Sequence, residues 1–195
     1  MRKIIFESGL SLDGFIEGPN GELGWSILGK QYSNTSTFVS KFDTIFCGRK
    51  AYEKFTLCGD REQWTEGQRE FAHTIRYMRK YVFSRDRKHV PGNALVVSEH
   101  LEAEVKRIRE EDGKSIWFCG GAEIFRTFAD LDLIDEYILT IYPVMLRAGT
   151  LLFQNGDKPS NLELMQKCHL KEGVVRLHYR PQSRINRFCD DSRSF

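Results

Sequence analysis

The chain has 195 residues, of which 29 are Lys or Arg and 27 are Asp or Glu, so its formal net charge is only +2. This balance gives no strong field for nucleic acid or a membrane surface, and no apolar run approaches the roughly 18 residues of a membrane span. The 5 cysteines, with no C-x-x-C pair, and the 5 scattered histidines argue against a disulfide framework and a metal site. We therefore expect a cytoplasmic protein without metal.

The first predicted strand covers residues 3–10, and these residues are typical of a buried strand rather than a signal peptide. A loop follows with Ser11-Leu12-Asp13-Gly14 and then the turn sequence Gly18-Pro19-Asn20-Gly21. This glycine-rich loop either covers a ligand or forms an ordinary hairpin, since Asn-Gly is a favoured two-residue turn. Between Trp25 and Phe42 the apolar pattern gives only a partial helical face.

A second strand, residues 42–47, is predicted to end in Gly48-Arg49-Lys50, where a helix begins. Cations at a helix N-terminus oppose the helix dipole by a few tenths of a kcal/mol up to about 1 kcal/mol. The pair is therefore either a solvated basic helix end or a place where an anion binds. A third strand, residues 80–83, is followed by Ser84-Arg85, so its carboxyl end is basic as well. We call the residues that directly follow a strand its exit.

The turn with the largest consequence for function is Gly120-Gly121. It follows a predicted strand over residues 116–119 and precedes a helix that runs to about Ala129. Two glycines let the backbone adopt positive φ and approach a ligand closely, and the helix start offers unpaired N–H groups to a phosphate. Taken alone, the pair is more typical of a tight structural turn.

The remaining predicted elements are a helix at 65–75, a strand at 94–97, a helix that begins near Leu101 and stops at Asp112-Gly113, a long strand at 137–144, a loop with a short strand at 146–153, and an antiparallel hairpin of 162–172 and 174–180. Pro143 within the long strand indicates a sheet edge or a bulge. Residues 1–180 are expected to form one domain, and residues 181–195, which show no period, a flexible tail.

Strands that alternate with helices and end in a hairpin predict an α/β fold. We expect a three-layer αβα sandwich around a mixed, mostly parallel sheet with an antiparallel hairpin at its C-terminal end. In such sheets ligands bind beyond the carboxyl ends of the strands, and three strands leave glycines or cations there. A ligand with separated phosphates fits these exits, and NADPH would use all three. The grouping favours phosphate binding at Gly120-Gly121.

Five motifs in this order resemble the dihydrofolate reductase superfamily, in particular bacterial proteins related to the reductase (C-terminal) domain of riboflavin biosynthesis. They are Ser11-Leu12-Asp13-Gly14, Gly48-Arg49-Lys50-Ala51-Tyr52-Glu53, Val82-Phe83-Ser84-Arg85, Gly120-Gly121-Ala122-Glu123-Ile124-Phe125 and Leu139-Thr140-Ile141-Tyr142-Pro143-Val144. The resemblance implies a mixed sheet of about eight strands, an NADPH cofactor, and hydride transfer to a C=N or C=O carbon of a small heterocyclic or carbonyl substrate. It also implies a homodimer, while the balanced charge already argues against a nucleic-acid or membrane partner.

The resemblance further implies which residues bind NADPH. They are Leu12 at the nicotinamide, Gly48, Arg49 and Lys50 at the adenosine-side phosphates, Ser84 and Arg85 beside the adenosine ribose, and Gly120, Gly121, Ala122, Glu123 and Ile124 around the pyrophosphate and the nicotinamide ribose.

Two departures from the family pattern concern the substrate. Folate reductases carry a carboxylate on the helix after the first loop, whereas residues 25–42 contain no Asp or Glu. Riboflavin-pathway reductases typically have an acidic residue before the Gly-Gly pair, where this chain has Cys119. We therefore do not expect reduction of dihydrofolate itself. A nucleotide-binding protein of the same fold with little or no catalysis remains an alternative.

The candidate catalytic residue is Asp13, which either orients the substrate or relays a proton, or else fixes its own turn. Three aromatic residues, Trp25, Tyr32 and Tyr142, either line the substrate pocket or belong to the core.

Overall fold

The computed structural model describes residues 1–26, 38–57, 66–85, 90–154 and 159–182. The predicted tail beyond residue 182, and the candidate pocket residue Tyr32, lie outside these ranges. The strands are β1 (Ile4–Ser11), β2 (Phe15–Glu17), β3 (Phe42–Gly48), β4 (Arg79–Phe83), β5 (Leu95–Val97), β6 (Ser115–Phe118), β7 (Glu136–Tyr142), β8 (Thr150–Leu151), β9 (Leu162–His169) and β10 (Val175–Pro181). The helices are α2 (Arg49–Leu57), α3 (Glu66–Tyr77), α4 (Leu101–Glu110), α5 (Ala122–Asp130) and a single 3-10 turn, η1 (Lys171–Gly173).

The main sheet is 8-stranded, in the order β5-β4-β3-β6-β1-β7-β10-β9. The first six strands of this order, from β5 across to β7, run parallel to one another. β10 is antiparallel to both of its neighbours, β7 and β9. A separate two-stranded sheet joins β2 to β8. The predicted mixed, mostly parallel sheet with a C-terminal hairpin is confirmed.

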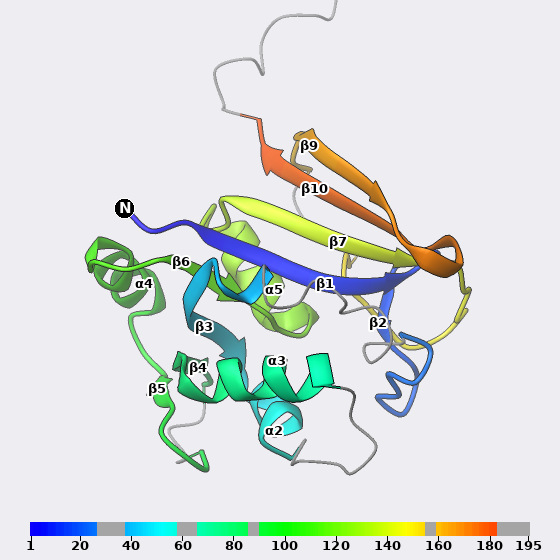
Figure 1. Cartoon of the computed structure of the whole chain (residues 1–195). Helices are drawn as coiled ribbons and strands as arrows, with labels where there is room; N and C mark the ends of the chain where they lie inside the picture. The colour runs from blue at the N-terminus through cyan, green and yellow to red at the C-terminus, as the bar shows by residue number, and fades with distance from the viewer. Residues whose placement is uncertain (27–37, 58–65, 86–89, 155–158, 183–195) are drawn as a thin grey trace, which may run out of the picture.

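Each face of the sheet carries its own apolar core, and helices cover both. Figure 1 shows α2 and α3 together on one side. Their residues Tyr52 and Ile75 pack in a cluster with Trp117 of β6. On the other face, Phe128 of α5 stacks on Phe118 of β6 with ring centroids 4.3 Å apart. Parallel strands covered on both faces need apolar side chains on both faces, so β1 begins with an unbroken apolar run.

Two expectations about turns need correction. Pro143 does not mark an edge or a bulge, because β7 lies between β1 and β10 and ends at Tyr142. Proline has no N–H for the ladder, so it follows the strand instead of interrupting it. The turn that closes with the bond from the Gly21 N–H to the Gly18 carbonyl, 3.0 Å long, does not make a hairpin either. β2 pairs with distant β8 rather than with a strand that follows the turn.

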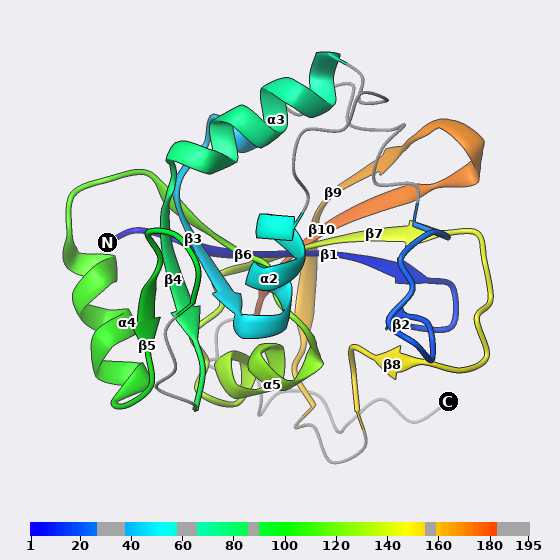
Figure 2. The same cartoon turned by 90° about the horizontal axis from the view of Figure 1, so that it is seen from below.

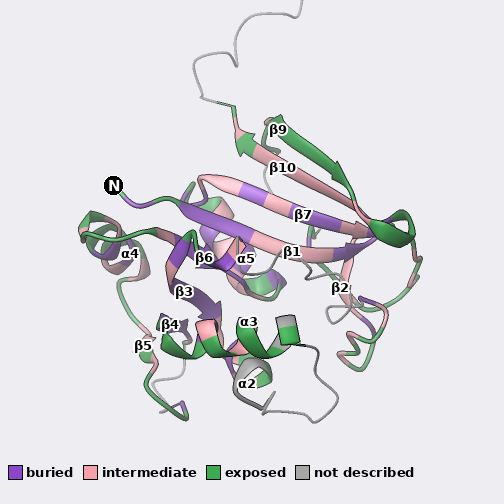
Figure 3. Ribbon diagram, viewed as in Figure 1, coloured by how far each residue is buried: buried purple, intermediate pink, exposed green. Residues whose placement is uncertain are grey.

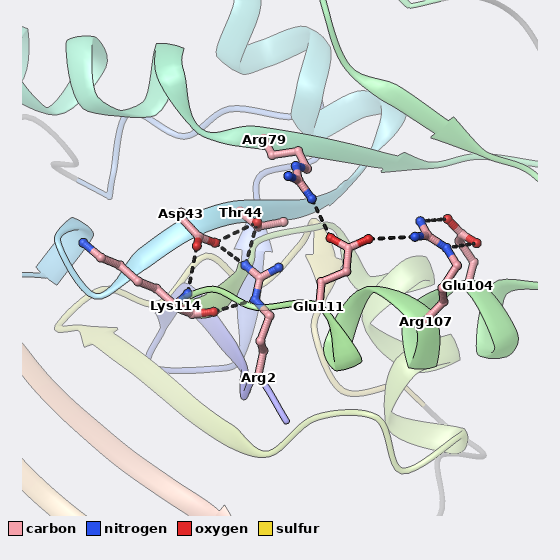
Figure 4. A network of polar contacts seen from close by, with 8 residues as sticks. All are labelled: Arg2, Asp43, Thr44, Arg79, Glu104, Arg107, Glu111 and Lys114. Atoms are coloured by element: carbon pink, nitrogen blue, oxygen red, sulfur yellow. Dashed lines mark hydrogen bonds and ion pairs between the residues drawn. The ribbon is translucent and has the colours of Figure 1, made fainter.

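A network of charged side chains fixes the amino ends of the strands (Figure 4). Arg2, only 6 % exposed, pairs with Asp43 and donates to the Thr44 hydroxyl at 2.7 Å and to the Lys114 carbonyl at 2.6 Å. These contacts join the start of the chain to the beginnings of β3 and β6. The network is therefore structural, and it lies at the opposite end of the strands from the glycine-rich exits.

Candidate functional site

The three predicted strand exits meet at one edge of the sheet. β3 lies between β4 and β6, with Gly48 paired to Phe83 and Phe46 paired to Phe118. Because neighbouring parallel strands end side by side, Gly48-Arg49-Lys50, Ser84-Arg85 and Gly120-Gly121 lie next to one another. Figure 2 shows β3 running directly into α2, with β4 and α5 beside it. The grouping that the sequence predicted is thus present.

Gly120 and Gly48 are glycines because Ile124 of α5 lies against both. A Cβ atom on Gly120 would lie 2.6 Å from the Ile124 Cγ2 atom, and a Cβ atom on Gly48 would lie 3.3 Å from the same atom. The Gly120 Cβ position is also only 3.6 Å from the backbone nitrogen of Gly48. The two turns therefore pack directly against each other, which brings the starts of α2 and α5 together.

Gly121 has a different reason to be glycine. It is the N-cap of α5, with φ −74° and ψ 172°, and a Cβ atom there would meet no described atom within 4 Å. The first helical bond runs from the Phe125 N–H to the Gly121 carbonyl, 3.1 Å, so the N–H groups of Ala122, Glu123 and Ile124 have no partner within the helix. Open space in front of a helix N-terminus is a favourable place for a phosphate.

Two cations of the site, Arg49 and Arg85, lie along its β4 side. The Arg49 Nε atom donates to the Ser84 hydroxyl at 3.3 Å. Arg85 forms an ion pair of 2.7 Å with Glu123 of α5, and both side chains are largely exposed. Lys50 is exposed as well. Since exposed ion pairs contribute only about 0–1 kcal/mol, Arg85 can exchange Glu123 for an anionic ligand at little cost.

Asp13 uses both of its carboxylate oxygens to hold a distant loop. Oδ1 accepts hydrogen bonds from the Ser11 hydroxyl at 2.7 Å and the Leu146 N–H at 3.1 Å, and Oδ2 accepts one from the Arg147 N–H at 2.8 Å. Desolvation raises the pKa of Asp13, but these bonds outweigh it and the pKa is lowered. The geometry favours the turn-fixing role over a catalytic one. Leu12 beside it is 65 % exposed, at the carboxyl end of β1.

Two of the three candidate pocket aromatics come together. The rings of Trp25 and Tyr142 meet edge to face with centroids 5.8 Å apart. A Cβ atom on Gly9 of β1 would lie 3.0 Å from the Tyr142 ring, so the edge of the ring lies against the middle of β1. Burial, and then the charge of Glu7, raise the pKa of Tyr142.

Glu7 is the residue that the sequence analysis missed. It stands in the half-buried middle of β1, which Figure 3 shows in pink between two buried ends. Burial raises the pKa of Glu7, while the charge of Arg176 and the Trp117 indole lower it. Burial is also the main cause that raises the pKa of nearby Cys119, followed by Cys47 and Glu7. Cys119 is thus a neutral thiol. The sequence did carry one sign of Glu7, because it is the only acid within the apolar run of the first strand.

The described residues contain no group of three or more His, Cys, Asp or Glu that could hold a metal ion, and no helix among them is long and apolar enough to cross a membrane.

Comparison with known proteins gives a consistent result. The family model of the RibD C-terminal domain matches residues 2–176. The uncharacterized protein YyaP of Bacillus subtilis (strain 168) is 34 % identical over 178 residues, which cover 91 % of this chain and 94 % of YyaP.

Two solved structures share the fold at low sequence identity. A diaminohydroxyphosphoribosylaminopyrimidine deaminase/5-amino-6-(5-phosphoribosylamino)uracil reductase from Thermotoga maritima superposes with a TM-score of 0.65 and 14 % identity, covering 93 % of this chain and 57 % of that one. Dihydrofolate reductase from Enterococcus faecalis, complexed with NADP(H), gives a TM-score of 0.62 and 13 % identity, covering 93 % and 97 %. These likenesses confirm the dihydrofolate-reductase-like fold.

Proposed function

The chain belongs to the RibD C-terminal domain family, and on that premise we propose that it is a reductase that uses NADPH to transfer a hydride to a small heterocyclic or carbonyl substrate. The observation that carries the proposal is the meeting of three strand exits, with the starts of α2 and α5, at one edge of the sheet. The reductase named in Thermotoga and the NADP(H) complex of the Enterococcus enzyme support it.

The residues at this edge fit a dinucleotide with an additional phosphate. Gly121 leaves open space in front of the α5 N–H groups, where a pyrophosphate would bind. Arg49, Ser84 and Arg85 lie on the neighbouring exits of β3 and β4, where the adenosine end and its phosphate would bind. Guanidinium groups recognise phosphates through paired hydrogen bonds, so we infer a preference for NADPH over NADH.

The protein contributes to the reaction by orienting the cofactor and the substrate and by excluding water from the site. When bound, the cofactor supplies the hydride from its nicotinamide C4 atom. Leu12, exposed at the carboxyl end of β1 and next to β6 in the sheet, offers an apolar surface to a flat ring. Asp13 acts as a positioning residue, because it fixes the loop at Leu146 and Arg147 to this strand end. Trp25 and Tyr142 would enclose the substrate and exclude water.

Titration of the purified chain with NADPH and with NADH tests the cofactor assignment. Tryptophan fluorescence would report binding, and loss of the reduced nicotinamide absorbance with a panel of nitrogen heterocycles and carbonyl compounds would report turnover. We expect NADPH to bind more tightly than NADH. If neither cofactor binds, the proposal is wrong.

A nucleotide-binding protein with little or no catalysis is the second candidate. It is favoured by Cys119, a buried neutral thiol where related reductases carry an acid, and by the absence of Asp and Glu from residues 25–42. Tight NADPH binding without oxidation on any compound of the panel would support this candidate over the reductase.

A further inference from the structure

Glu7 is unusual because a charged side chain occupies the middle of an interior strand. β1 lies between β6 and β7, and its residues on both sides of the central three are buried. Side chains alternate along a strand, so Glu7 faces the same side as Ile5, which packs with Trp117 and Cys119. The Phe6–Phe118 pair places Glu7 level with Cys119, the residue just before Gly120.

The groups around Glu7 come from three other strands of the sheet, β6, β7 and β10. β6 contributes the Trp117 indole, which is 2 % exposed, and the Cys119 thiol. β7 contributes the Tyr142 hydroxyl, and β10 contributes Arg176. Arg176 acts on Glu7 through its charge but directs its Nε atom to the Thr140 hydroxyl at 3.3 Å. Within the described part of the chain, no ion pair is formed by the Glu7 carboxylate.

A half-buried carboxylate without an ion pair is costly, because it loses water without gaining a counter-charge in contact. Its surroundings explain how a ligand could repay that loss. Towards the carboxyl end of β1, Ser26 and Tyr142 lie against Gly9. Towards its amino end, the rings of Phe38 and Trp117 meet edge to face with centroids 5.9 Å apart. Aromatic rings of Trp117 and Tyr142 and the carboxylate of Glu7 therefore lie together on this face of β1.

We propose that Glu7 binds the substrate, its two carboxylate oxygens accepting two adjacent N–H groups from an amino-substituted nitrogen heterocycle. The inference rests on the proposed reductase function and names the substrate class of the same site. Paired hydrogen bonds to a carboxylate are strong and directional, and a ring that presents a carbonyl oxygen at this edge would meet the carboxylate with its lone pairs. Glu7 thereby selects 2-amino heterocycles and rejects the corresponding carbonyl forms.

A matched pair of probes tests this selection. 2-Aminoquinoline presents two adjacent N–H groups in its protonated form, whereas 2-quinolone, of the same size, presents one N–H and one carbonyl. Binding of each to the NADPH-saturated chain and to the chain alone would be measured by NMR titration. We expect 2-aminoquinoline to bind at least about tenfold more tightly than 2-quinolone.

Variants separate Glu7 from the rest of the site. Glu7→Gln should weaken 2-aminoquinoline binding on the order of 10- to 100-fold and leave the NADPH affinity within about twofold. Glu7→Asp keeps the charge and should retain part of the binding. Glu136→Gln is the control, because this carboxylate lies on the adjacent strand and is already paired with Lys3 at 2.7 Å and His178 at 2.8 Å.

The outcomes distinguish the two proposals. Equal binding of both probes, no binding of 2-aminoquinoline, or unchanged binding by Glu7→Gln overturns the role of Glu7 even if NADPH binds. Failure of NADPH to bind overturns the reductase proposal. In that case, binding of the two probes to the chain without NADPH still tests the role of Glu7. If the Glu7 variants do not fold, the preference of the unmodified chain between the two probes decides.

Discussion

The two adjacent glycines before α5 should respond differently to substitution by alanine: the first in stability, the second in NADPH binding. Gly120→Ala adds a Cβ atom 2.6 Å from the Ile124 Cγ2 atom, well inside van der Waals contact. Ile124 cannot simply turn away, because it is β-branched and lies in the first turn of α5, where one χ1 rotamer is strongly preferred. The first turn of α5 must therefore move, and the N–H groups that we propose to bind the cofactor move with it.

The magnitude follows from overpacking. Forcing an extra carbon into a packed interior costs about 1–3 kcal/mol, and the lower unfolded-state entropy of alanine returns about 0.4–1 kcal/mol. We expect Gly120→Ala to lower the free energy of unfolding by about 1–2 kcal/mol, a fall in Tm of roughly 2–8 °C. Gly121→Ala should leave stability nearly unchanged, because its Cβ atom meets no described atom within 4 Å. It should nevertheless weaken NADPH about tenfold by filling the space before the helix.

Thermal unfolding and NADPH titration of both variants check this contrast. A double variant, Gly120→Ala with Ile124→Ala, removes the clashing methyl group and should be less destabilised than the sum of the single changes. Additive losses in the double variant would refute the packing argument. Unchanged NADPH binding by Gly121→Ala would refute the assignment of the space before α5.

Four further predictions concern charge and assembly. Arg49→Ala should weaken NADPH at least about tenfold and NADH much less, and equal losses by titration would contradict its phosphate role. Arg2→Met should lower the free energy of unfolding by about 1–3 kcal/mol in urea denaturation without changing NADPH affinity, since Arg2 lies at the opposite end of the strands. The hydrogen bond from Lys54 lowers the pKa of Glu17, so its stabilisation is present above the ordinary pKa of 4.5 and lost as pH falls through the lowered one. Glu17→Gln should abolish this loss of stability at low pH, which amounts to under about 1 kcal/mol; thermal unfolding measured over a range of pH checks it. We also propose that β9, exposed along its length as Figure 3 shows, pairs with a second copy. Met165→Lys should then shift sedimentation toward the monomer, and an unaltered dimer would contradict this surface.

The parts of the site that the sequence predicted are those encoded locally. A strand, a glycine and a helix start follow one another within a few residues at Gly48 and at Gly120, so their pattern is visible without the fold. Their adjacency also followed, because parallel strands end at a common edge. The two glycines nevertheless have different structural reasons, one close packing and the other open space, and no local pattern distinguishes these.

The parts that escaped prediction depend on contacts distant in sequence. Asp13 was a candidate catalytic acid because its partners, the N–H groups of Leu146 and Arg147, lie more than a hundred residues away. Glu7 was passed over because its meaning depends on the order of β6, β1 and β7, which places it level with Cys119. The β2–β8 sheet joins two very short strands, whose pairing no periodicity reveals.

The central place of β1 sets the order in which the fold can be completed. Both of its neighbours, β6 and β7, belong to the second half of the chain, so during synthesis the apolar first strand emerges long before either partner exists. Long-range parallel pairing of this kind is slow to form and leaves apolar surface exposed meanwhile. On the ribosome, the edge of β1 that pairs with β7 therefore stays unpaired until synthesis has passed Tyr142.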